Sequence, residues 1–342
     1  MNKMKIIGMS IGLGAMAAGA AAAFLAPKAI LEYKYRIAYP SRYKLQKEKF
    51  TDKNADRIHF LNTGWSDAIL IESKGKFALV DCGEDSDNPR NLPALEFEGQ
   101  EEKILAYLKK HAVNSEGKVE LEFIVGTHAH SDHLGGFDTL INDDDVIVKK
   151  AFLKPYDASR ISDYEIEEWD NQEVYDQTVN ALNAKGVEII SEISDDFFDF
   201  GNFRCKFYNT AIYKGDKKRG ENENSLALYL TCKGKTVLLA GDVNNIDGAE
   251  TEIANQTGKV NLLKIGHHGN PKSTTTEFVR KTMPDIGILT SNIYGLHKQA
   301  KKDITNISKT SVYGTMNENG IIATFADSGI VLTNHIQDDL NL

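Results

Sequence analysis

Hydrophobic and polar residues alternate in short runs through most of the chain, beginning at Arg57. The first three runs read RIHFLN, AILIES and FALVDC, and the segments NTGWSD and SKGK separate them. Alternating runs of this length, bounded by Gly, Asn, Asp and Ser, predict β-strands joined by tight turns. Comparable runs, which predict further strands, occur at 121–128, 187–191, 197–209, 225–234 and 235–242.

Segments with a helical pattern lie between these strands. They cover residues 100–111, 135–141 and 164–184, and helical and strand patterns alternate from 247 to 290. The runs IIATFAD and GIVLTN predict a closing hairpin around Asp327. By itself this order supports only an α/β or an α+β fold. Because hairpins and mixed strands dominate each half, we expect an α+β fold in which helices cover two packed sheets, a four-layer αββα sandwich.

The N-terminal residues differ in composition from the rest. Residues 6–26 carry no charge, follow two lysines, and reach the roughly 20 apolar residues that a bilayer-spanning helix needs. We therefore expect 1–26 to be a membrane anchor or a signal helix, 27–55 a juxtamembrane linker, and 56–342 the folded domain. An uncleaved anchor is favoured, because the apolar stretch is long for a signal peptide and Pro27 would hinder cleavage just before it.

Two features of the sequence argue for opposite orientations of this segment in the membrane. Five lysines and arginines occur at positions 28–44, and the positive-inside rule would keep the following domain in the cytoplasm. The very short N-terminal tail and the signal-like layout argue for export. We expect a single-pass anchor with the folded domain outside the cytoplasm, and secretion after cleavage is the alternative.

Composition and charge narrow the class of protein. Of 342 residues, 41% are hydrophobic and 26% are charged, which is typical of a globular protein. The net charge of −9 gives no basic footprint of the kind that nucleic-acid-binding proteins usually carry. The three cysteines are scattered and include no CxxC pair, so we expect buried, unpaired thiols.

The sequence THAHSDHLGG, directly after an apolar strand, carries the strongest chemical signal. It places His128, His130, Asp132 and His133 within six residues of a loop, where their side chains can converge on one point. Imidazole nitrogens and carboxylate oxygens are the ligands that zinc favours in catalytic sites. The segment therefore predicts a metal site.

Two later segments add candidate ligands. The apolar strand VLLA is followed by Gly241 and Asp242, and a carboxylate at a strand end can bridge two cations through its two oxygens. The pair His267-His268 follows another apolar run, NLLKI. No histidine occurs between His133 and Asp242.

These motifs resemble those of the metallo-β-lactamase superfamily. Within it, the chain resembles the teichoic-acid phosphorylcholine esterases and the hydrolase domain of DNA-uptake channel proteins. The resemblance rests on THAHSDHLGG, LLAGD and HHG, together with HFLNTGWSDAILIESKGKFALVDCG at 59–83 and the strand start Asn224-Ser225-Leu226. The esterases are the closer match, through Trp169-Asp170-Asn171 and the segments at 83–87 and 242–245. This chain lacks their choline-binding repeats.

The resemblance implies a role for each candidate. His128 and His130 would hold a first metal ion, Asp132 and His133 a second, and Asp242 would bridge the two. One histidine of the pair 267–268 would complete the site, while the other would contact the substrate phosphate or donate a proton, so Asp132, His267 and His268 are the candidate catalytic residues. Asn224 or water would replace the histidine that many members supply to the first metal. Zn²⁺ is the expected ion, two per chain, with Mn²⁺ as the alternative.

We expect a metal-dependent hydrolase, and phosphodiesters of small molecules or of the cell wall, including phosphorylcholine esters, are the expected substrates. Aromatic rings bind quaternary ammonium groups, so Trp65 and Trp169 are expected to contact the substrate together with Asn224. A single-stranded DNA nuclease is the first alternative, with nucleic acid not the favoured partner. The second is a non-catalytic surface protein with a vestigial site. His297 is expected at the surface, and His59, His111 and His335 are expected to be structural or solvated.

Overall fold

The computed structural model describes residues 45–86 and 98–334 of the chain. Residues 1–44 are outside the described part, so the expected anchor or signal helix and most of the expected linker are too. Among the residues that the structure describes, no helix is both long and apolar enough to cross a bilayer.

The folded unit begins earlier than the sequence pattern indicated. Residues 45–55, which we assigned to the linker, belong to the same compact unit as the rest of the described chain. The two-residue strand β1 (Gln46–Lys47) pairs in parallel with β17 (Gly329–Asn334), and Arg57 lies over the ring of Phe50. These backbone and ring contacts make residues 45–55 part of the domain.

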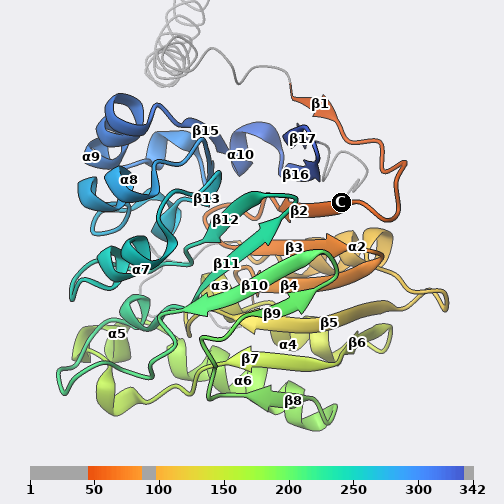
Figure 1. The fold of residues 1–342 in the computed structure, drawn as a ribbon. Coiled ribbons are helices and arrows are strands. Elements are labelled where there is room, and N and C mark those ends of the chain that lie inside the picture. Colours follow the sequence, from red (N-terminus) through yellow and green to blue (C-terminus); the bar gives the residue numbers. More distant parts are fainter. Residues whose placement is uncertain (1–44, 87–97, 335–342) are drawn as a thin grey trace, which may run out of the picture. The chain divides into compact units, whose positions relative to one another are not determined.

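Two β-sheets form the centre of the fold (Figure 1). The first has ten strands and is mixed: pairing is antiparallel from β17 through β16, β2 and β3 to β4, and parallel from β4 to β8 and between β1 and β17. In pairing order its strands are β1, β17, β16 (Ile321–Ala326), β2 (Asp56–Phe60), β3 (Ala68–Ser73), β4 (Lys76–Cys82), β5 (Val119–Gly126), β7 (Lys150–Leu153) and β8 (Glu188–Ile190), with β6 (Val146–Val148) also pairing with β5.

The second sheet has seven strands and divides into two halves. Strands β9 to β12 are antiparallel, whereas β12 to β15 are parallel. In chain order its strands are β9 (Phe198–Phe200), β10 (Phe203–Tyr208), β11 (Ala227–Cys232), β12 (Lys235–Leu239), β13 (Leu262–Lys264), β14 (Ile286–Leu289) and β15 (Ser311–Gly314). The parallel half requires a crossover helix between successive strands.

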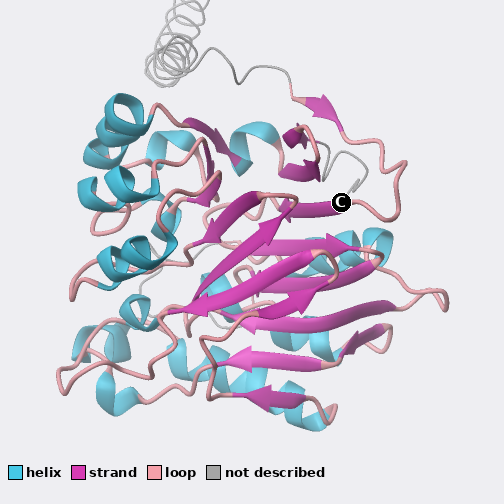
Figure 2. Ribbon diagram, in the orientation of Figure 1, coloured by secondary structure: helices cyan, strands magenta, loops and turns pink. Residues whose placement is uncertain are grey.

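Helices lie around the strands (Figure 2). Three of them, α2, α4 and α6, pack with the first sheet in one apolar cluster, and α7, α8 and α9 are the crossovers of the parallel half of the second sheet. Their bounds are α2 (Glu101–His111), α3 (Ser131–Leu134), α4 (Phe137–Asn142), α5 (Asp163–Glu168), α6 (Asn171–Ala184), α7 (Ala249–Thr257), α8 (Thr276–Thr282), α9 (Lys298–Asp303) and α10 (Thr315–Glu318). Right-handed crossovers that advance in one direction place their helices on the same face of a sheet.

The core between the two sheets explains the alternation seen in the sequence. Val237 and Leu239 of β12 belong to the apolar cluster that joins the sheets, whereas Leu238 between them is buried outside that cluster. Side chains of Ile58, Phe60 and other residues of the first sheet complete this cluster. Two packed sheets with helices outside them agree with the expected α+β sandwich. The three cysteines are buried and unpaired, as expected.

Candidate metal centre

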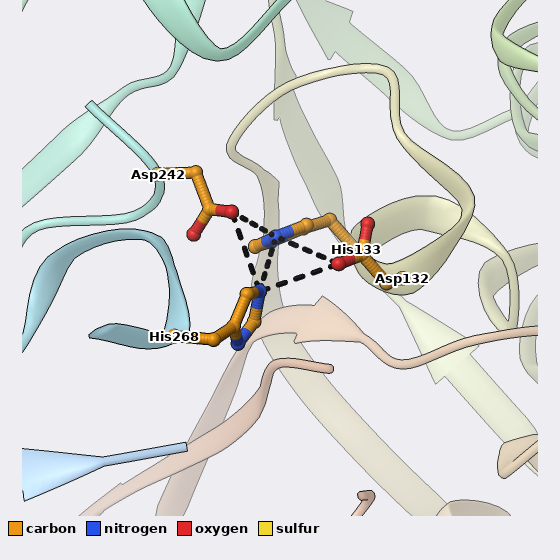
Figure 3. Close-up of side chains that lie close together, drawn as sticks. All are labelled: Asp132, His133, Asp242 and His268. Carbon is orange, nitrogen blue, oxygen red and sulfur yellow. Dashed lines mark hydrogen bonds and ion pairs between the residues drawn. The ribbon is translucent and has the colours of Figure 1, made fainter. Parts of the chain in front are cut away.

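Four side chains with metal-binding atoms converge at one end of the sheets (Figure 3). Asp132, His133, Asp242 and His268 each offer one atom, and these atoms all lie within 4.8 Å of one another. Nε2 of His268 lies 3.2 Å from Nε2 of His133 and 3.3 Å from an oxygen of each aspartate. Nε2 of His133 lies 3.3 Å from Asp242 Oδ2. Of the adjacent pair 267–268, the structure therefore brings His268 into the cluster.

The cluster joins the two sheets. The HxHxDH segment follows β5 of the first sheet, and α3 carries its last two candidate ligands. Asp242 follows β12, and His268 lies in the 3₁₀ turn Gly266–Gly269 after β13, both in the second sheet. Functional side chains commonly gather at the carboxyl ends of strands in this way.

The backbone around the second-sheet residues is held in unusual conformations. Gly241 has a φ of +50°, and a Cβ there would collide with Ser225 Oγ and with the carbonyl of Leu226. His267 and His268 also have positive φ angles, 49° and 48°. Non-glycine residues rarely adopt this region, and such conformations cluster at functional sites.

The hydrogen bonds of His133 and His268 leave Nε2 free to face the cluster. Nδ1 of His268 lies 3.1 Å from the carbonyl oxygen of Thr290, and Nδ1 of His133 lies 2.7 Å from Asp81 Oδ2. Both partners accept hydrogen bonds, so Nδ1 carries the proton in the neutral ring. The Nε2 lone pairs therefore point toward the two aspartates, as in metal-ligating histidines.

His128 and His130 are oriented by the same principle. Nε2 of His130 lies 3.4 Å from Glu165 Oε2, so Nδ1 of His130 presents the lone pair. The Thr127 hydroxyl donates to Asp81 and lies 3.0 Å from His128 Nδ1, so it accepts the proton of that ring. The two inward atoms, Nε2 of His128 and Nδ1 of His130, lie 3.1 Å apart.

This donor set fits divalent cations. The site offers four imidazole nitrogens, each on a ring that an oxygen atom holds in place, and the carboxylates of two aspartates. Imidazole nitrogen and carboxylate oxygen are the ligands that zinc and related metals prefer. Only the half around Asp132, His133, Asp242 and His268 brings four such atoms within 4.8 Å of one another. Among the described residues, His128 and His130 belong to no such group of three or more. A first metal ion held by this pair would have open positions.

A buried layer of charge lies under the cluster. Asp67 and Asp81 are 1% and 0% exposed, and with His133 they form a second close group. Lys264, at 0% exposure, pairs with Asp67 at 2.5 Å and with Asp242 at 3.2 Å. Charges are buried at such cost only when they are paired or hold metals.

The pKa values of the rings reflect this negative surrounding. Burial disfavours the charged form of His268, but the carboxylates of Asp242 and Asp67 outweigh burial and raise its pKa to about 10. The pKa of His133 is raised well above its usual range in the same way, against burial, by Asp242, Asp132 and Asp81. For His267, burial dominates and lowers the pKa to about 4. The carboxylates thus stabilise positive charge beside the inner nitrogens of the rings, and divalent cations would also supply that charge.

The other predicted residues, Trp65, Trp169 and Asn224, have different surroundings. The ring of Trp169 stacks on His130 at 4.9 Å between centroids, and Trp65 lies directly against Gly295. Asn224 donates to Glu221 and accepts from the backbone N–H of Tyr213. These bonds place Asn224 in the wall of a neighbouring pocket.

Of the remaining histidines, His335 lies outside the residues that the structure describes, so its role stays an expectation. His267 Nδ1 lies 3.1 Å from Asn244 Oδ1, and its Nε2 lies 3.9 Å from Asp242 Oδ2. His297 is exposed. His59 contacts Tyr107 Oη and Glu72 within the protein interior.

Sequence reasoning missed four residues that support the ligands. Asp81 and Glu165 hold the outer nitrogens of His133 and His130, Glu221 accepts from the backbone N–H of Ala129, and Lys264 pairs with Asp242. Asp81 and Lys264 left a signal: each is a charged residue within an otherwise apolar strand. Glu165 and Glu221 have no such signal in the sequence, because each comes close to the site only through tertiary contacts.

A pocket opens beside the cluster. Its wall includes Asn224 and also Asn244, which contacts His267. Three cationic side chains line it: Lys214 pairs with Glu252 and Arg219 with Asp247, while Lys217 has no ion-pair partner among the described residues. The remaining polar lining includes Tyr213 and Glu223.

Comparison with known proteins assigns the family. Residues 78–270 match the model of the beta-lactamase superfamily domain, which is more than half of the chain. The chain therefore belongs to the metallo-β-lactamase superfamily, as its HxHxDH segment indicated.

Two curated relatives are much longer than this chain. ComE operon protein 3 of Bacillus subtilis (strain 168) is 21% identical over 244 residues, covering 68% of this chain and 28% of the relative. Recombination protein 2 of Haemophilus influenzae is 23% identical over 291 residues, covering 84% of this chain and 30% of the relative. The chain thus spans less than a third of each relative.

Among solved structures, the metallo-beta-lactamase fold protein YhfI from Bacillus subtilis is similar to this chain. The TM-score is 0.45 at 14% identity, with 76% of this chain and 96% of that protein covered. Similarity at this level adds nothing to the family assignment.

Proposed function

We propose that this chain is a metal-dependent phosphodiesterase with a dinuclear site, for which Zn²⁺ is the favoured ion and Mn²⁺ the alternative. One observation carries the proposal: four histidines are each held at the outer nitrogen by an oxygen, the inner nitrogens of His133 and His268 converge with Asp132 and Asp242, and those of His128 and His130 face each other. In the proposed assignment, His128 and His130 hold the first ion, and Asp132, His133 and His268 hold the second. Asp242 lies between them.

Two cations at these positions would supply an activated water as nucleophile and would neutralise charge on the attacked phosphoryl group. The chain's own residues orient the reactants. Asp132 is the less buried of the two aspartates, so it is the one assigned to orient the attacking water. Asn244 accepts from Nδ1 of His267, so the neutral His267 ring presents Nε2 as an acceptor at the edge of the site. A ring in this state has no Nε2 proton to donate, so His267 is assigned as a hydrogen-bond acceptor and not as a proton donor.

The surroundings of the cluster support an anionic substrate that also carries an apolar or cationic group. Lys217 lies in the neighbouring pocket with Asn224, and its ammonium has no ion-pair partner within 45–86 and 98–334. Trp169 lies on the ring of a proposed metal ligand, His130, and is partly exposed. An aromatic face beside a phosphoryl site suits the quaternary ammonium of a phosphorylcholine ester. We therefore propose phosphorylcholine-type or other cell-surface phosphodiesters as substrates.

The metal assignment is tested by elemental analysis of the purified chain and of two variants. We expect close to two divalent ions per wild-type chain, activity that disappears with chelator and returns with zinc or manganese, and loss of both metal and activity in Asp242→Ala. His111→Ala changes a histidine remote from the cluster and is expected to keep both. A wild-type chain without stoichiometric metal would overturn the proposal.

Substrate choice is tested with two chromogenic esters. We expect p-nitrophenyl-phosphorylcholine to be cleaved faster than bis-p-nitrophenyl phosphate, by about two- to thirty-fold, the range that a cation–π contact supplies. Trp169→Ala and Trp65→Ala should reduce this preference and spare cleavage of the choline-free diester. If neither substitution alters the preference, the aromatic residues do not select the substrate.

The second candidate function is a single-stranded DNA nuclease. One relative is named Recombination protein 2, which points to nucleic acid, and the pocket carries Lys214, Lys217 and Arg219. A nuclease would cleave single-stranded DNA faster than either ester, and its affinity would fall steeply with salt concentration. That result would replace the phosphorylcholine proposal and keep the metal assignment.

We also propose that residues 6–26 attach the chain to a membrane and that the folded domain lies outside the cytoplasm. The uncharged composition of this stretch supports attachment. Fractionation of cells, followed by protease treatment of intact cells, tests both parts. Recovery of the full-length chain in the soluble cytoplasmic fraction would contradict them.

A further inference from the structure

A lysine occupies a position in the core between the two sheets. Lys264 is the last residue of β13, and its register partners on the neighbouring strands are Leu239 and Ile288. Both partners belong to the apolar cluster that joins the sheets, as does Leu262, two residues earlier on the same face. Alternation would place another apolar residue at position 264, yet a fully buried lysine occurs there.

Three acceptors surround the Lys264 ammonium. Nζ lies 2.9 Å from the carbonyl oxygen of Gly241, 3.2 Å from Asp242 Oδ1 and 2.5 Å from Asp67 Oδ2. The ammonium donates hydrogen bonds to the Gly241 carbonyl and to Asp242 Oδ1, and it forms an ion pair with Asp67. Asp67 directly precedes β3 of the first sheet, whereas Gly241 and Asp242 follow β12 of the second. The lysine therefore links the sheets directly beneath the metal centre.

The contact with Lys264 gives the two carboxylate oxygens of Asp242 different partners. Oδ1 faces Lys264, while Oδ2 faces Nε2 of His133 and of His268, at 3.3 Å each. A carboxylate held in this way would offer only Oδ2 to a bound cation, because rotation would break the contact with Lys264. Charge is divided as well: the carboxylates of Asp67, Asp81, Asp132 and Asp242 belong to two close groups that share His133, and two of them, Asp67 and Asp242, contact the ammonium of Lys264.

We propose that Lys264 is a positioning residue of the metal centre and its permanent internal cation. It fixes Asp242 so that Oδ2 alone faces the metals, and it neutralises part of the carboxylate charge that the metals would otherwise have to balance. The inference rests on the proposed function only in that the cluster binds divalent cations.

The two partners of the ion pair should change metal affinity in opposite directions. Lys264→Met removes a positive charge beside the ligands, so the folded protein should bind Zn²⁺ at least about tenfold more tightly. Asp67→Asn removes a negative charge and should weaken binding by a similar factor. Competition with a chromophoric chelator measures both affinities on the full chain. Loss of packing would weaken binding in both variants, so opposite signs identify the role of charge.

Activity supplies a second readout. With metal at saturation, Lys264→Met should still lose most of its kcat, because Asp242 is free to rotate, while KM changes little. Lys154→Met is the matched control: Lys154 is also buried, but its ammonium donates to the carbonyls of Asn209 and Ala211. We expect this control to leave zinc affinity within about threefold of wild type, since it lies outside the carboxylate cluster.

The double variant Asp67→Asn with Lys264→Met keeps the test decisive if the single methionine variant does not fold. Removing both charges should return zinc affinity close to the wild-type value, about tenfold above Asp67→Asn alone. Equal affinities in the double variant and in Asp67→Asn would overturn the role of Lys264, as would a shift in the same direction for both single variants. A wild-type chain that binds no divalent cation would instead overturn the proposed function, so the two failures are distinguishable.

Discussion

Each histidine of the metal centre is oriented by an oxygen atom that contacts its outer ring nitrogen. Asp81 orients two of these rings, one directly and one through Thr127. Its Oδ2 accepts from His133 Nδ1 and from the Thr127 hydroxyl, which in turn accepts from His128. Its Oδ1 accepts from the backbone N–H of Thr127. One carboxylate thus sets the ring orientation of a ligand on each side of the proposed pair of ions.

Asp81→Asn should therefore weaken metal binding without removing any ligand. An amide has only one oxygen, so it cannot accept on both sides as the carboxylate does. Loss of such an outer partner typically costs about 10- to 100-fold in metal affinity. A zinc titration of the purified variant measures it, and Asp285→Asn, at an exposed aspartate, is the control. Unchanged zinc affinity in Asp81→Asn would show that the ring orientations do not depend on this contact.

Glu250 makes the stability of the folded state depend on pH. Glu250 is buried at the start of α7, where its oxygens accept from the backbone N–H groups of Thr274 and Thr275. Burial raises its pKa from 4.5 to about 7, against these hydrogen bonds. A raised pKa in the folded state means that the folded chain retains a proton that the unfolded chain has lost. Stability from this group is complete below about pH 4.5 and is lost as pH rises toward 7.

Comparison of wild type with Glu250→Gln isolates this effect, since other titrating groups cancel. We expect the stability of wild type relative to the variant to fall between pH 5 and pH 7.5 by about 2–3 kcal/mol, at 1.36 kcal/mol for each pKa unit. Urea unfolding at the two pH values measures it. A difference that stays constant, or that grows with pH, would show that the carboxyl remains ionised throughout.

The sequence revealed the ligands more readily than their supports. HxHxDH places four candidates in one loop, so spacing alone pointed to a metal site. Asp81 and Lys264 lie 52 and 22 residues from His133 and Asp242, and only the pairing of strands brings them near. The choice between His267 and His268 also depended on backbone conformation, since positive φ angles turn adjacent rings in different directions.

The elements followed the hydrophobic pattern closely where the strands are buried along nearly their whole length. Strands β2 to β4 and the helix α2 lie where alternation and helical periodicity placed them. The expected helix at 164–184 is instead two, α5 and α6, because Trp169 adopts an extended conformation between them. Strands β6 and β7 were not predicted, since Lys149 and Lys150 interrupt the apolar run that forms them.

The turn after β12 controls where Asp242 lies, and Gly241→Ala tests that control. The new Cβ would collide with Ser225 and with the Leu226 carbonyl, so the turn must shift and move Asp242 with it. We expect lower metal content and a lower melting temperature. Gly234→Ala is the matched control, because Gly234 also has a positive φ, +70°, but a Cβ added there would meet nothing within 4 Å.

The control should lose about 1–2 kcal/mol from the left-handed conformation and keep its metal. Elemental analysis and thermal unfolding of both variants separate backbone strain from displacement of the ligand. Equal metal content in the two variants would mean that the turn tolerates the side chain without moving Asp242.

The metal centre has a consequence for the whole domain, because its ligands come from both sheets. Asp132 and His133 follow a strand of the first sheet, and Asp242 and His268 follow strands of the second. Any ion bound by all four joins the two halves of the domain. The hydrophobic pattern could predict two sheets, but the point at which they are joined depends on contacts more than 100 residues apart along the chain (132 and 268).

Chelation should therefore destabilise the entire folded unit, and not only the active site. An ion present at about 1,000 times its Kd stabilises the folded state by about 4 kcal/mol, which corresponds to roughly 10 °C in melting temperature for a domain of this size. We expect a single unfolding transition that shifts by this amount when chelator is added and returns with zinc. Asp242→Ala, which removes the ligand between the two proposed ions, should melt at the same temperature with and without chelator. A shift confined to a minor transition would show that the ion stabilises only the loops around it, and that the two sheets are held together by their shared apolar core.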